Sequence, residues 1–489
     1  MSGLIEFATF AWCWLWDNMI YLNMILAIVI VFFERRDPRA VWAWLLVLYF
    51  LPGIGFLMYL IAGQNMNKNR MFRIKEIEDQ LNSEIRKQSE VVKNEIEMTK
   101  SYEDKGYKEL AYYNLRTSGS VYTDDNAVSI YTDGHEKFDA LIEKMERAKK
   151  YIHIQYYIIR DDELFERIKE VLIRKAAEGV EVRILYDGMG CREIRKKQWK
   201  MLGLRGIQTA EFFPAKLKKL HLRINYRNHR KIVVIDGEVG FVGGFNVGRE
   251  YLGLDKKFGY WRDTHMKIEG SAVLALQIRF LLDWNYASGN NLFLEDKYFT
   301  QEKAGVGKSG VQIISSGPDS KWKTIRDDYV YLISHATDHI YIQTPYFVPD
   351  ETMLDTLKMA ASSGVDVRIM IPCKPDHPFV YWATYSYIGE MLQAGASCYT
   401  YDNGFIHTKG MCVDGKVCSY GTANFDIRSF QLNFEVNAVM YDEEVTRRFE
   451  EIFKNDLQKS TKITLHKYNN RSLIIKVKEQ FSRLLSPLL

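Results

Sequence analysis

One pattern of polar residues occurs twice in this 489-residue chain and constrains its fold more than any other feature. The first copy, NHRKIVVIDGEVGFVGGFN (228–246), contains four polar residues at fixed positions: His229, Lys231, Asp236 and Asn246. The second copy, IHTKGMCVDGKVCSYGTAN (406–424), contains the same four: His407, Lys409, Asp414 and Asn424. The two histidines and the two asparagines are each 178 residues apart. This doubled spacing indicates that the chain holds two related halves.

The chemistry of the repeated pattern follows from its residue types. The apolar run after each lysine predicts a short buried strand that ends at an Asp-Gly turn. Side chains two apart point to the same face of a strand, so each copy presents one imidazole and one ammonium together. Two such faces that meet would suit a phosphodiester. Lysines and asparagines would bind the anionic oxygens, while one imidazole attacks and the other supplies a proton.

The two copies resemble the paired HKD motifs of the phospholipase D superfamily. The apolar N-terminal segments, the wording RNHRKIVVIDG and the ending SPLL resemble bacterial cardiolipin synthases within it. The resemblance implies an α/β fold: an N-terminal membrane hairpin, then two phospholipase D-like α/β/α domains related by a pseudo-twofold axis through one active site. It also implies transfer of a phosphatidyl group between two phosphatidylglycerol molecules, which yields cardiolipin and glycerol through a phosphohistidine. We expect no metal and no cofactor.

The resemblance also implies roles for the repeated residues. By the habit of the family, His229 is the nucleophile and His407 the acid and then the base, although the sequence is symmetric on this point. Both roles are accessible near pH 7 for an imidazole with an unperturbed pKa of about 6.5. We expect the phosphoryl oxygens to be held by Lys231, Asn246, Lys409 and Asn424.

Acidic residues outside the strands complete the expected site. A carboxylate on the far nitrogen of a histidine fixes its tautomer. In the superfamily this acid follows the motif, which implies Glu435 for the second half. Asp263 is the candidate in the first half, although it lies 34 residues after its histidine and Glu435 lies 28 after its own. We expect the motif acids Asp236 and Asp414 to close turns at the far ends of the strands.

The order of predicted elements also repeats. The first half reads as a strand, a helix and a strand, at Tyr151–Tyr157, Glu163–Glu178 and Val180–Tyr186. The second half repeats them at His339–Phe347, Asp350–Ser363 and Val365–Ile371. Strand–helix–strand order predicts parallel pairing with helices on the sheet faces. We therefore expect two layered domains, at 115–300 and 301–470.

The N-terminal region has the composition of a membrane anchor, which we assign to residues 1–65. Val41–Ala62 contains 22 residues without a charge, enough to cross a bilayer, whereas Met19–Phe33 is short for a full span. Basic residues follow both segments in similar number, so the orientation stays open. Residues 66–114 predict a charged helical connector. Six cysteines without a C-x-x-C pair favour a reducing compartment, which places the catalytic head in the cytoplasm.

Two further segments favour an anionic membrane as partner. Lys216–Lys231 holds seven Lys and Arg residues and no acidic one. Residues 471–489 predict a basic amphipathic helix that lies on a membrane or on the head domain. Because no nucleic-acid-binding module is recognisable, we expect phosphatidylglycerol and cardiolipin as partners rather than nucleic acid. The oligomeric state stays open.

Four other functions remain compatible with these motifs. A hydrolytic phospholipase D or another phosphatidyltransferase would share all of them. A membrane-tethered nuclease would share them and favour DNA over lipid. A non-enzymatic membrane scaffold would leave both motifs without a role.

Overall fold

The computed structural model describes residues 18–32, 38–51, 53, 55, 56, 59, 102–213, 226–290, 292, 295–299 and 306–484. The chain divides into two compact units. The first comprises Met1–Arg73 and Ala215–Tyr226, and the second, called the head here, comprises Ile74–Pro214 and Arg227–Leu489. Each is described by itself.

The first unit contains two helices, α2 (Met19–Phe32) and α3 (Pro38–Phe50). They are joined by a hydrogen bond from the Asn23 amide to the carbonyl of Leu48 (3.1 Å). Most of their apolar side chains are exposed, as Trp42 is at 67%. No helix in the described ranges is both long and apolar enough to cross a membrane. The expected span Val41–Ala62 lies partly outside the described residues, and α3 ends within it at Phe50.

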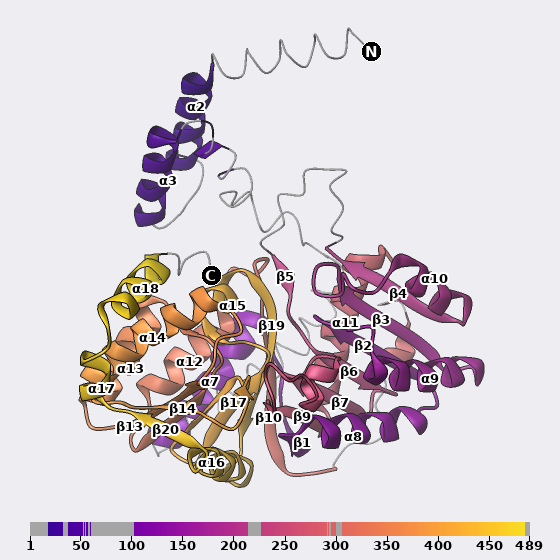
Figure 1. Cartoon of the computed structure of the whole chain (residues 1–489). Coiled ribbons are helices and arrows are strands. Elements are labelled where there is room, and N and C mark those ends of the chain that lie inside the picture. The colour runs from indigo at the N-terminus through magenta and orange to yellow at the C-terminus, as the bar shows by residue number, and fades with distance from the viewer. Residues whose placement is uncertain are drawn as a thin grey trace. The chain divides into compact units, whose positions relative to one another are not determined.

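The head is built on one large sheet (Figure 1). In the first half the elements are α7 (Tyr102–Ser118), β1 (Tyr122–Tyr131), α8 (Gly134–Glu146), β2 (Tyr151–Tyr156), α9 (Glu163–Ala177), β3 (Glu181–Asp187), α10 (Lys196–Leu204), β4 (Ile207–Phe212), β5 (Arg227–Asn228), β6 (Ile232–Ile235), β7 (Val239–Gly243), η2 (Arg249–Leu252), β8 (Trp261–Arg262), β9 (His265–Glu269), α11 (Ala272–Ser288) and η4 (Asp296–Tyr298).

The second half repeats this order with a longer C-terminal part. Its elements are β10 (Ser309–Ser316), α12 (Thr324–Ser334), β11 (His339–Gln343), β12 (Phe347–Val348), α13 (Glu351–Ser362), β13 (Asp366–Pro372), α14 (Pro378–Gln393), β14 (Ser397–Tyr401), β15 (Phe405–Ile406), β16 (Gly410–Val413), β17 (Val417–Gly421), β18 (Phe425–Asp426), α15 (Ile427–Gln431), β19 (Asn433–Tyr441), α16 (Glu443–Leu457), β20 (Ser460–Ile463), α17 (Leu465–Asn469) and α18 (Leu473–Leu484).

The strand order of the sheet is mirrored about its centre. Among the described residues it runs β20-β14-β13-β11-β16-β17-β19-β10-β1-β9-β7-β6-β2-β3-β4. The antiparallel pair β1–β10 joins the halves, and each step outward from it meets corresponding strands. The first copy of the polar pattern runs from the end of β5 through β6 and β7, and the second runs from the end of β15 through β16 and β17, so they occupy equivalent places in the sheet.

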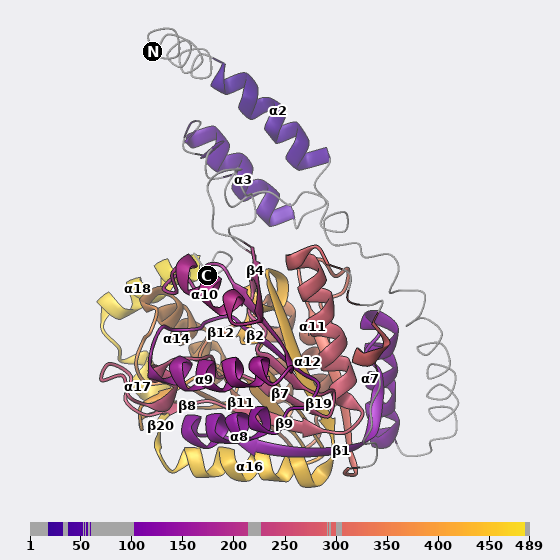
Figure 2. The ribbon, with the colours of Figure 1, turned by 90° about the vertical axis from the view of Figure 1, so that its right-hand side faces the viewer.

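Helices cover both faces of the sheet in each half. In the first half Ile152 and Ile154 pack in a core with α8 and α9, while His153 between them stacks on Phe280 of α11 at 4.5 Å. In the second half Ile340 and Ile342 pack with α12–α14, while Tyr341 stacks on Phe453 of α16. Alternating side chains therefore feed two cores, and Figure 2 shows α9 and α11 on opposite sides of the strands. The predicted α/β layering is present.

The predicted repeat elements match the structure closely. The strand expected at His339–Phe347 is divided into β11 and β12, because Pro345 between them has no N–H for a sheet. The end of the segment expected to be a charged connector differs more. Helix α7 continues to Ser118, and its Leu110 and Asn114 are fully buried against the second half. The earlier part of that segment lies outside the described residues.

Candidate active site

Two short parallel bridges between the halves assemble the candidate site. Strand β5, directly before His229, pairs with the start of β19 in the other half. Strand β15, directly before His407, pairs with β8 of the first half. The backbone N–H of His229 then donates to the carbonyl of Phe434 (3.0 Å), and that of His407 donates to the carbonyl of Arg262 (2.7 Å). Each histidine is thereby held beside the residue that comes directly after the bridged pair, Glu435 within β19 and Asp263 after β8.

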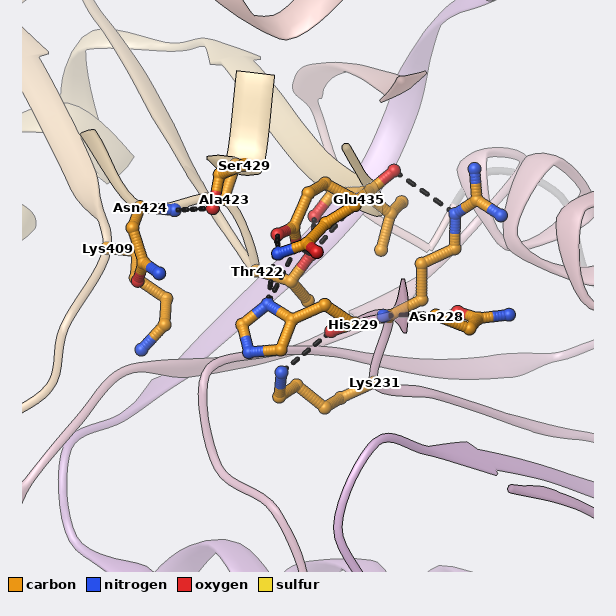
Figure 3. A network of polar contacts seen from close by, with 12 residues as sticks. Asn228, His229, Lys231, Lys409, Thr422, Ala423, Asn424, Ser429 and Glu435 are labelled. Carbon is orange, nitrogen blue, oxygen red and sulfur yellow. Dashed lines mark hydrogen bonds and ion pairs between the residues drawn. The ribbon is translucent and has the colours of Figure 1, made fainter. Parts of the chain in front are cut away.

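The residue beside His229 is Glu435. Both carboxylate oxygens of Glu435 lie 3.0 Å from Nδ1 of His229, as Figure 3 shows. The hydroxyl of Thr422 donates to the same carboxylate (2.6 Å) and fixes its orientation. Burial opposes the charge of Glu435, but His229 and Lys231 outweigh it and lower the pKa of the carboxyl. Glu435 is therefore a buried, ionised acceptor for the Nδ1 proton.

The residue beside His407 is Asp263. Its Oδ2 lies 2.8 Å from Nδ1 of His407, and the backbone N–H of Thr264 donates to Oδ1. Lys409 and His407 outweigh burial and lower the pKa of Asp263. Each acid thus serves the histidine of the other half, whereas the sequence assigned each to its own motif. The crossing depends on the two-residue bridges, which leave no periodic signal in the sequence.

Each lysine lies beside the histidine two residues before it, as expected, but both residues lie in the short segments that precede β6 and β16 rather than on those strands. The ammonium of Lys231 donates to the carbonyl of His229 (2.7 Å), and Lys409 donates to that of His407. Nζ of Lys409 also lies 2.7 Å from Nδ1 of His407 and 3.7 Å from Asp263. Burial lowers the pKa of Lys231 well below its ordinary value and that of Lys409 to about 8. Anionic phosphoryl oxygens would relieve this unfavourable burial of charge.

Both imidazoles of the candidate site have lowered pKa values. Burial is the main cause for each; Lys231 acts in the same direction at His229, and Lys409 at His407, where the pKa falls to about 4. The unperturbed value assumed from the sequence therefore does not hold in the folded site. Both rings are neutral near pH 7, and an acid on Nδ1 leaves the lone pair on Nε2 free to attack. A bound phosphodiester anion would raise both values and allow one ring to carry the second proton.

Aromatic side chains that the sequence did not single out surround the imidazoles. Tyr157 lies edge-on to His229, with ring centroids 4.9 Å apart. His407 lies among Trp261 (5.1 Å), Phe405 (6.0 Å) and Tyr346 (6.3 Å). The hydroxyl of Tyr346 donates to the carboxylate of Asp376. These rings limit water around the histidines, whose exposed fractions are 9% and 7%.

The asparagines and the small residues before them fix the loops that flank the site. Asn246 uses its carboxamide within the protein: Oδ1 accepts from the N–H of Ile158 and Nδ2 donates to the hydroxyl of Tyr251. Nδ2 of Asn424 donates to Asp426 (3.2 Å), while its buried Oδ1 has no partner in the described structure. A Cβ on Gly244 would stand 1.9 Å from Asp263, so a side chain there would displace that acid.

Asp236 and Asp414 lie at the far ends of β6 and β16, away from the imidazoles. The carboxylate of Asp236 accepts from the backbone N–H groups of residues 149–151 at 2.7–2.9 Å. Asp414 accepts in the same way from residues 337–339. Both have positive φ, near 55°, in the Asp-Gly turns. They anchor the chain that enters β2 and β11.

Two buried ion pairs support the bridges. Arg230 donates to both oxygens of Asp283 at 2.8 Å, and Arg262 pairs with Asp456 at 2.8 Å. Gln155 of β2 donates to Asp283, and Gln343 of β11 donates to Asp456. The repeated glutamine was a visible signal in the sequence, but its role depends on acids that lie on distant helices.

Comparisons with known proteins identify the family of the chain. The family model described as "Cardiolipin synthase, PLD-like domain" matches residues 141–260 and 329–457, which contain both polar patterns. The chain belongs to the cardiolipin synthase family of phospholipase D-like proteins. A second family model, "Phospholipase D-nuclease N-terminal", matches residues 22–64.

Curated members of the cardiolipin synthase family match nearly the whole chain. The major cardiolipin synthase of Bacillus subtilis (strain 168) is 50% identical over 475 residues, which cover 96% of this chain and 97% of that protein. A cardiolipin synthase of Staphylococcus aureus (strain N315) is 50% identical over 470 residues, which cover 96% of this chain and 95% of that protein. Among solved structures, phosphatidylserine synthase of Haemophilus influenzae Rd KW20 has a TM-score of 0.59 at 15% identity, covering 80% of this chain and 100% of that one, which indicates a shared fold.

Proposed function

We propose that this protein is a cardiolipin synthase, a phosphatidyltransferase that converts two phosphatidylglycerol molecules into cardiolipin and glycerol. The observation that carries the proposal is the pair of buried histidines, each with a carboxylate on Nδ1 from the other half and a lysine beside it. Membership of the cardiolipin synthase family supports the substrate.

In the first step Nε2 of His229 attacks the phosphorus of one phosphatidylglycerol. The P–N bond forms as the P–O bond to the glycerol headgroup breaks, and His407 donates a proton to the departing oxygen. Glu435 stabilises the positive charge that develops on the His229 ring. Lys231 and Lys409 neutralise the phosphoryl oxygens, and Asn246 and Asn424 turn toward them when they are bound.

In the second step His407 accepts a proton from a glycerol hydroxyl of a second phosphatidylglycerol. That oxygen attacks phosphorus, the P–N bond breaks, and His229 returns to its neutral form. Two substrates have then become cardiolipin and glycerol, with His407 restored as an acid. The His229 ring becomes positive in the first step and neutral in the second, and the His407 ring changes in the opposite order. Each ring has its own buried carboxylate, which stabilises its positive form.

The proposal includes the placement of the chain. Residues 1–65 form a membrane hairpin, with support from the apolar sequence of Val41–Ala62 and the N-terminal family match. The two halves of the head are related by a pseudo-twofold axis, which the mirrored strand order supports. The head lies on the cytoplasmic side, and its partners are phosphatidylglycerol, cardiolipin and the anionic membrane surface. Of the basic run Lys216–Lys231, residues 216–225 lie outside the described residues.

The test is the full-length protein in vesicles with phosphatidylglycerol that carries one label in an acyl chain and a second label in its glycerol headgroup. We expect cardiolipin and free glycerol in equal amounts, and loss of both products in His229→Ala and in His407→Ala. Chiefly phosphatidic acid would identify a hydrolase instead. Cleavage of DNA in preference to lipid would identify a nuclease.

A further inference from the structure

Helix α18 is attached to the head by its polar side. Glu479 and Ser482 are almost fully buried, and Arg471 donates to both oxygens of Glu479 at 2.6 Å. Arg483 pairs with Glu390 of α14, and Lys478 lies 5.4 Å from the ring of Trp382 on the same helix. Figure 1 shows α18 along α14 on the outside of the second half. The helix is thus fixed in place by charged and polar contacts.

The apolar side of α18 consequently points away from the head. Its large side chains are exposed by 56–79%: Leu473, Ile474, Val477, Phe481 and Leu484. Phe379, at the start of α14, is 51% exposed and lies 6.4 Å from the ring of Phe481. A surface helix of a water-soluble domain normally turns such a face inward. These six residues, called the outer apolar face here, form one patch over two elements.

The charges that accompany this patch are cationic. The only carboxylate of α18 is Glu479, which is buried and neutralised by Arg471, whereas Lys476 and Lys478 are exposed. Exposed lysines beside an exposed apolar face complement a surface that is anionic outside and apolar beneath. We propose that the outer apolar face docks the head onto an anionic lipid bilayer, and that α18 lies at the interface with its apolar side among the acyl chains.

The fold connects this surface to one of the two histidines. Phe379 follows the N-terminus of α14, only three residues after Asp376. Asp376 accepts from the hydroxyl of Tyr346, whose ring lies edge-on to His407. Docking therefore brings lipid headgroups to the His407 side, where the second substrate must deliver its hydroxyl. This last step rests on the proposed function; the docking itself does not.

A docked head would also favour transfer over hydrolysis. Water is present at roughly 55 M in bulk, so an exposed phosphohistidine would mostly yield phosphatidic acid. Holding the site at a surface rich in lipid hydroxyls raises the effective concentration of the acceptor. The outer apolar face should therefore affect the ratio of cardiolipin to phosphatidic acid more than it affects attack on phosphorus.

The direct test places a tryptophan on the helix of the full-length protein in vesicles of phosphatidylglycerol and phosphatidylcholine. Phe481→Trp adds a fluorophore on the apolar side, and Gln480→Trp adds one at an exposed polar position of the same helix. With bromine on the acyl chains, we expect the added emission of Phe481→Trp to be quenched more strongly than that of Gln480→Trp, because position 480 lies at the edge of the apolar side, between Val477 and Leu484. Equal quenching of the two, or none, would overturn the proposal. If quenching is absent and position 481 forms a cross-link to α2, to α3 or to a second copy of the chain, then protein and not lipid covers the face.

The functional test uses Val477→Asp with Phe481→Asp, and Gln480→Asp as the matched control. Because these positions are exposed, we expect all variants to cleave a soluble short-chain phosphodiester at the unmodified rate. The double variant should lower the ratio of cardiolipin to phosphatidic acid roughly tenfold, as expected from losing the insertion of two apolar side chains. An unchanged ratio would refute docking. No cleavage of either substrate by the unmodified protein would refute the proposed function instead.

Discussion

At the scale of single residues, the carboxylates of Asp263 and Glu435 determine which imidazole nitrogen carries the proton. Each accepts the proton of Nδ1 and leaves the lone pair on Nε2, the atom that the proposed mechanism uses. Both acids are fully buried and both have lowered pKa values. An ionised acid in this position stabilises its histidine ring when that ring carries a positive charge. In the two steps of the proposed mechanism this favours the transition states over the resting state.

The first prediction concerns Asp263→Asn. Asp263 raises the pKa of His407, so its removal should lower that pKa further below about 4 and leave the ring protonated less often, and so less available as the general acid. We expect turnover to fall by about 10²-fold or more, and the acidic limb of the pH–rate profile to move to lower pH. Turnover from pH 4 to 9 and histidine NMR provide the measurements. A purely structural role would lower activity without moving the limb.

The second prediction separates Asp236 and Asp414 from the chemistry. Asp236→Asn keeps the shape and tolerates the positive φ but leaves one of three backbone N–H groups without an acceptor. We expect a loss of about 1–3 kcal/mol in the free energy of unfolding. Turnover at an assay temperature of about 20 °C should stay within a few-fold of that of the unmodified protein. Thermal unfolding and activity are measured on the same sample. Loss of turnover in a fully folded variant would place Asp236 in the reaction.

At the scale of elements, α7 contacts the second half of the head through a titratable group. Nδ2 of Asn114 donates to Oδ1 of Asp328 on α12 at 3.0 Å. Burial raises the pKa of Asp328 to about 7. The folded protein therefore binds this proton more tightly than the unfolded chain does, and its stability decreases as the pH rises from about 4 through 7.

The third prediction follows from that sign. Asp328→Asn removes a charge that is unfavourable only at high pH, so it should change stability little near pH 4. Above pH 8 it should raise the free energy of unfolding by on the order of 1–4 kcal/mol. Melting temperatures at both pH values measure this. Asp355→Asn, at an exposed position on α13, should show no such pH dependence. The same shift at pH 4 and pH 8 would contradict a buried acid.

The elements also show what the sequence could predict. Strands β2, β3, β11 and β13 and helices α9 and α13 follow from local periodicity, and the lysine beside each histidine follows from their spacing of two residues. The partner of each acid does not, because β5, β8 and β15 are two residues long and exist only through pairing across the halves. The amphipathic pattern of α18 was visible, but not that its polar side would face inward. That choice depends on Arg471 and Glu390.

At the scale of the whole molecule, the site is complete only within one folded head. The antiparallel pair β1–β10 makes the two halves parts of one sheet, and both bridges cross that junction. His229 needs Glu435, and His407 needs Asp263, from the opposite half.

The fourth prediction is that two inactive chains cannot repair each other. A mixture of His229→Ala with His407→Ala should remain inactive, because every complete site requires both histidines from one chain. The proteins are coexpressed, purified together through different tags and assayed for cardiolipin. Recovery of a quarter of the activity of the unmodified protein would mean that halves of different chains exchange.

The crossed bridges also bear on how a duplicated gene can change. After most duplications one copy is free to accumulate substitutions while the other keeps the activity. Here a change in β8 misplaces the acid of the second motif, and a change in β19 misplaces the acid of the first. Selection on either histidine therefore acts on both copies, and neither half can become a passive support for the other.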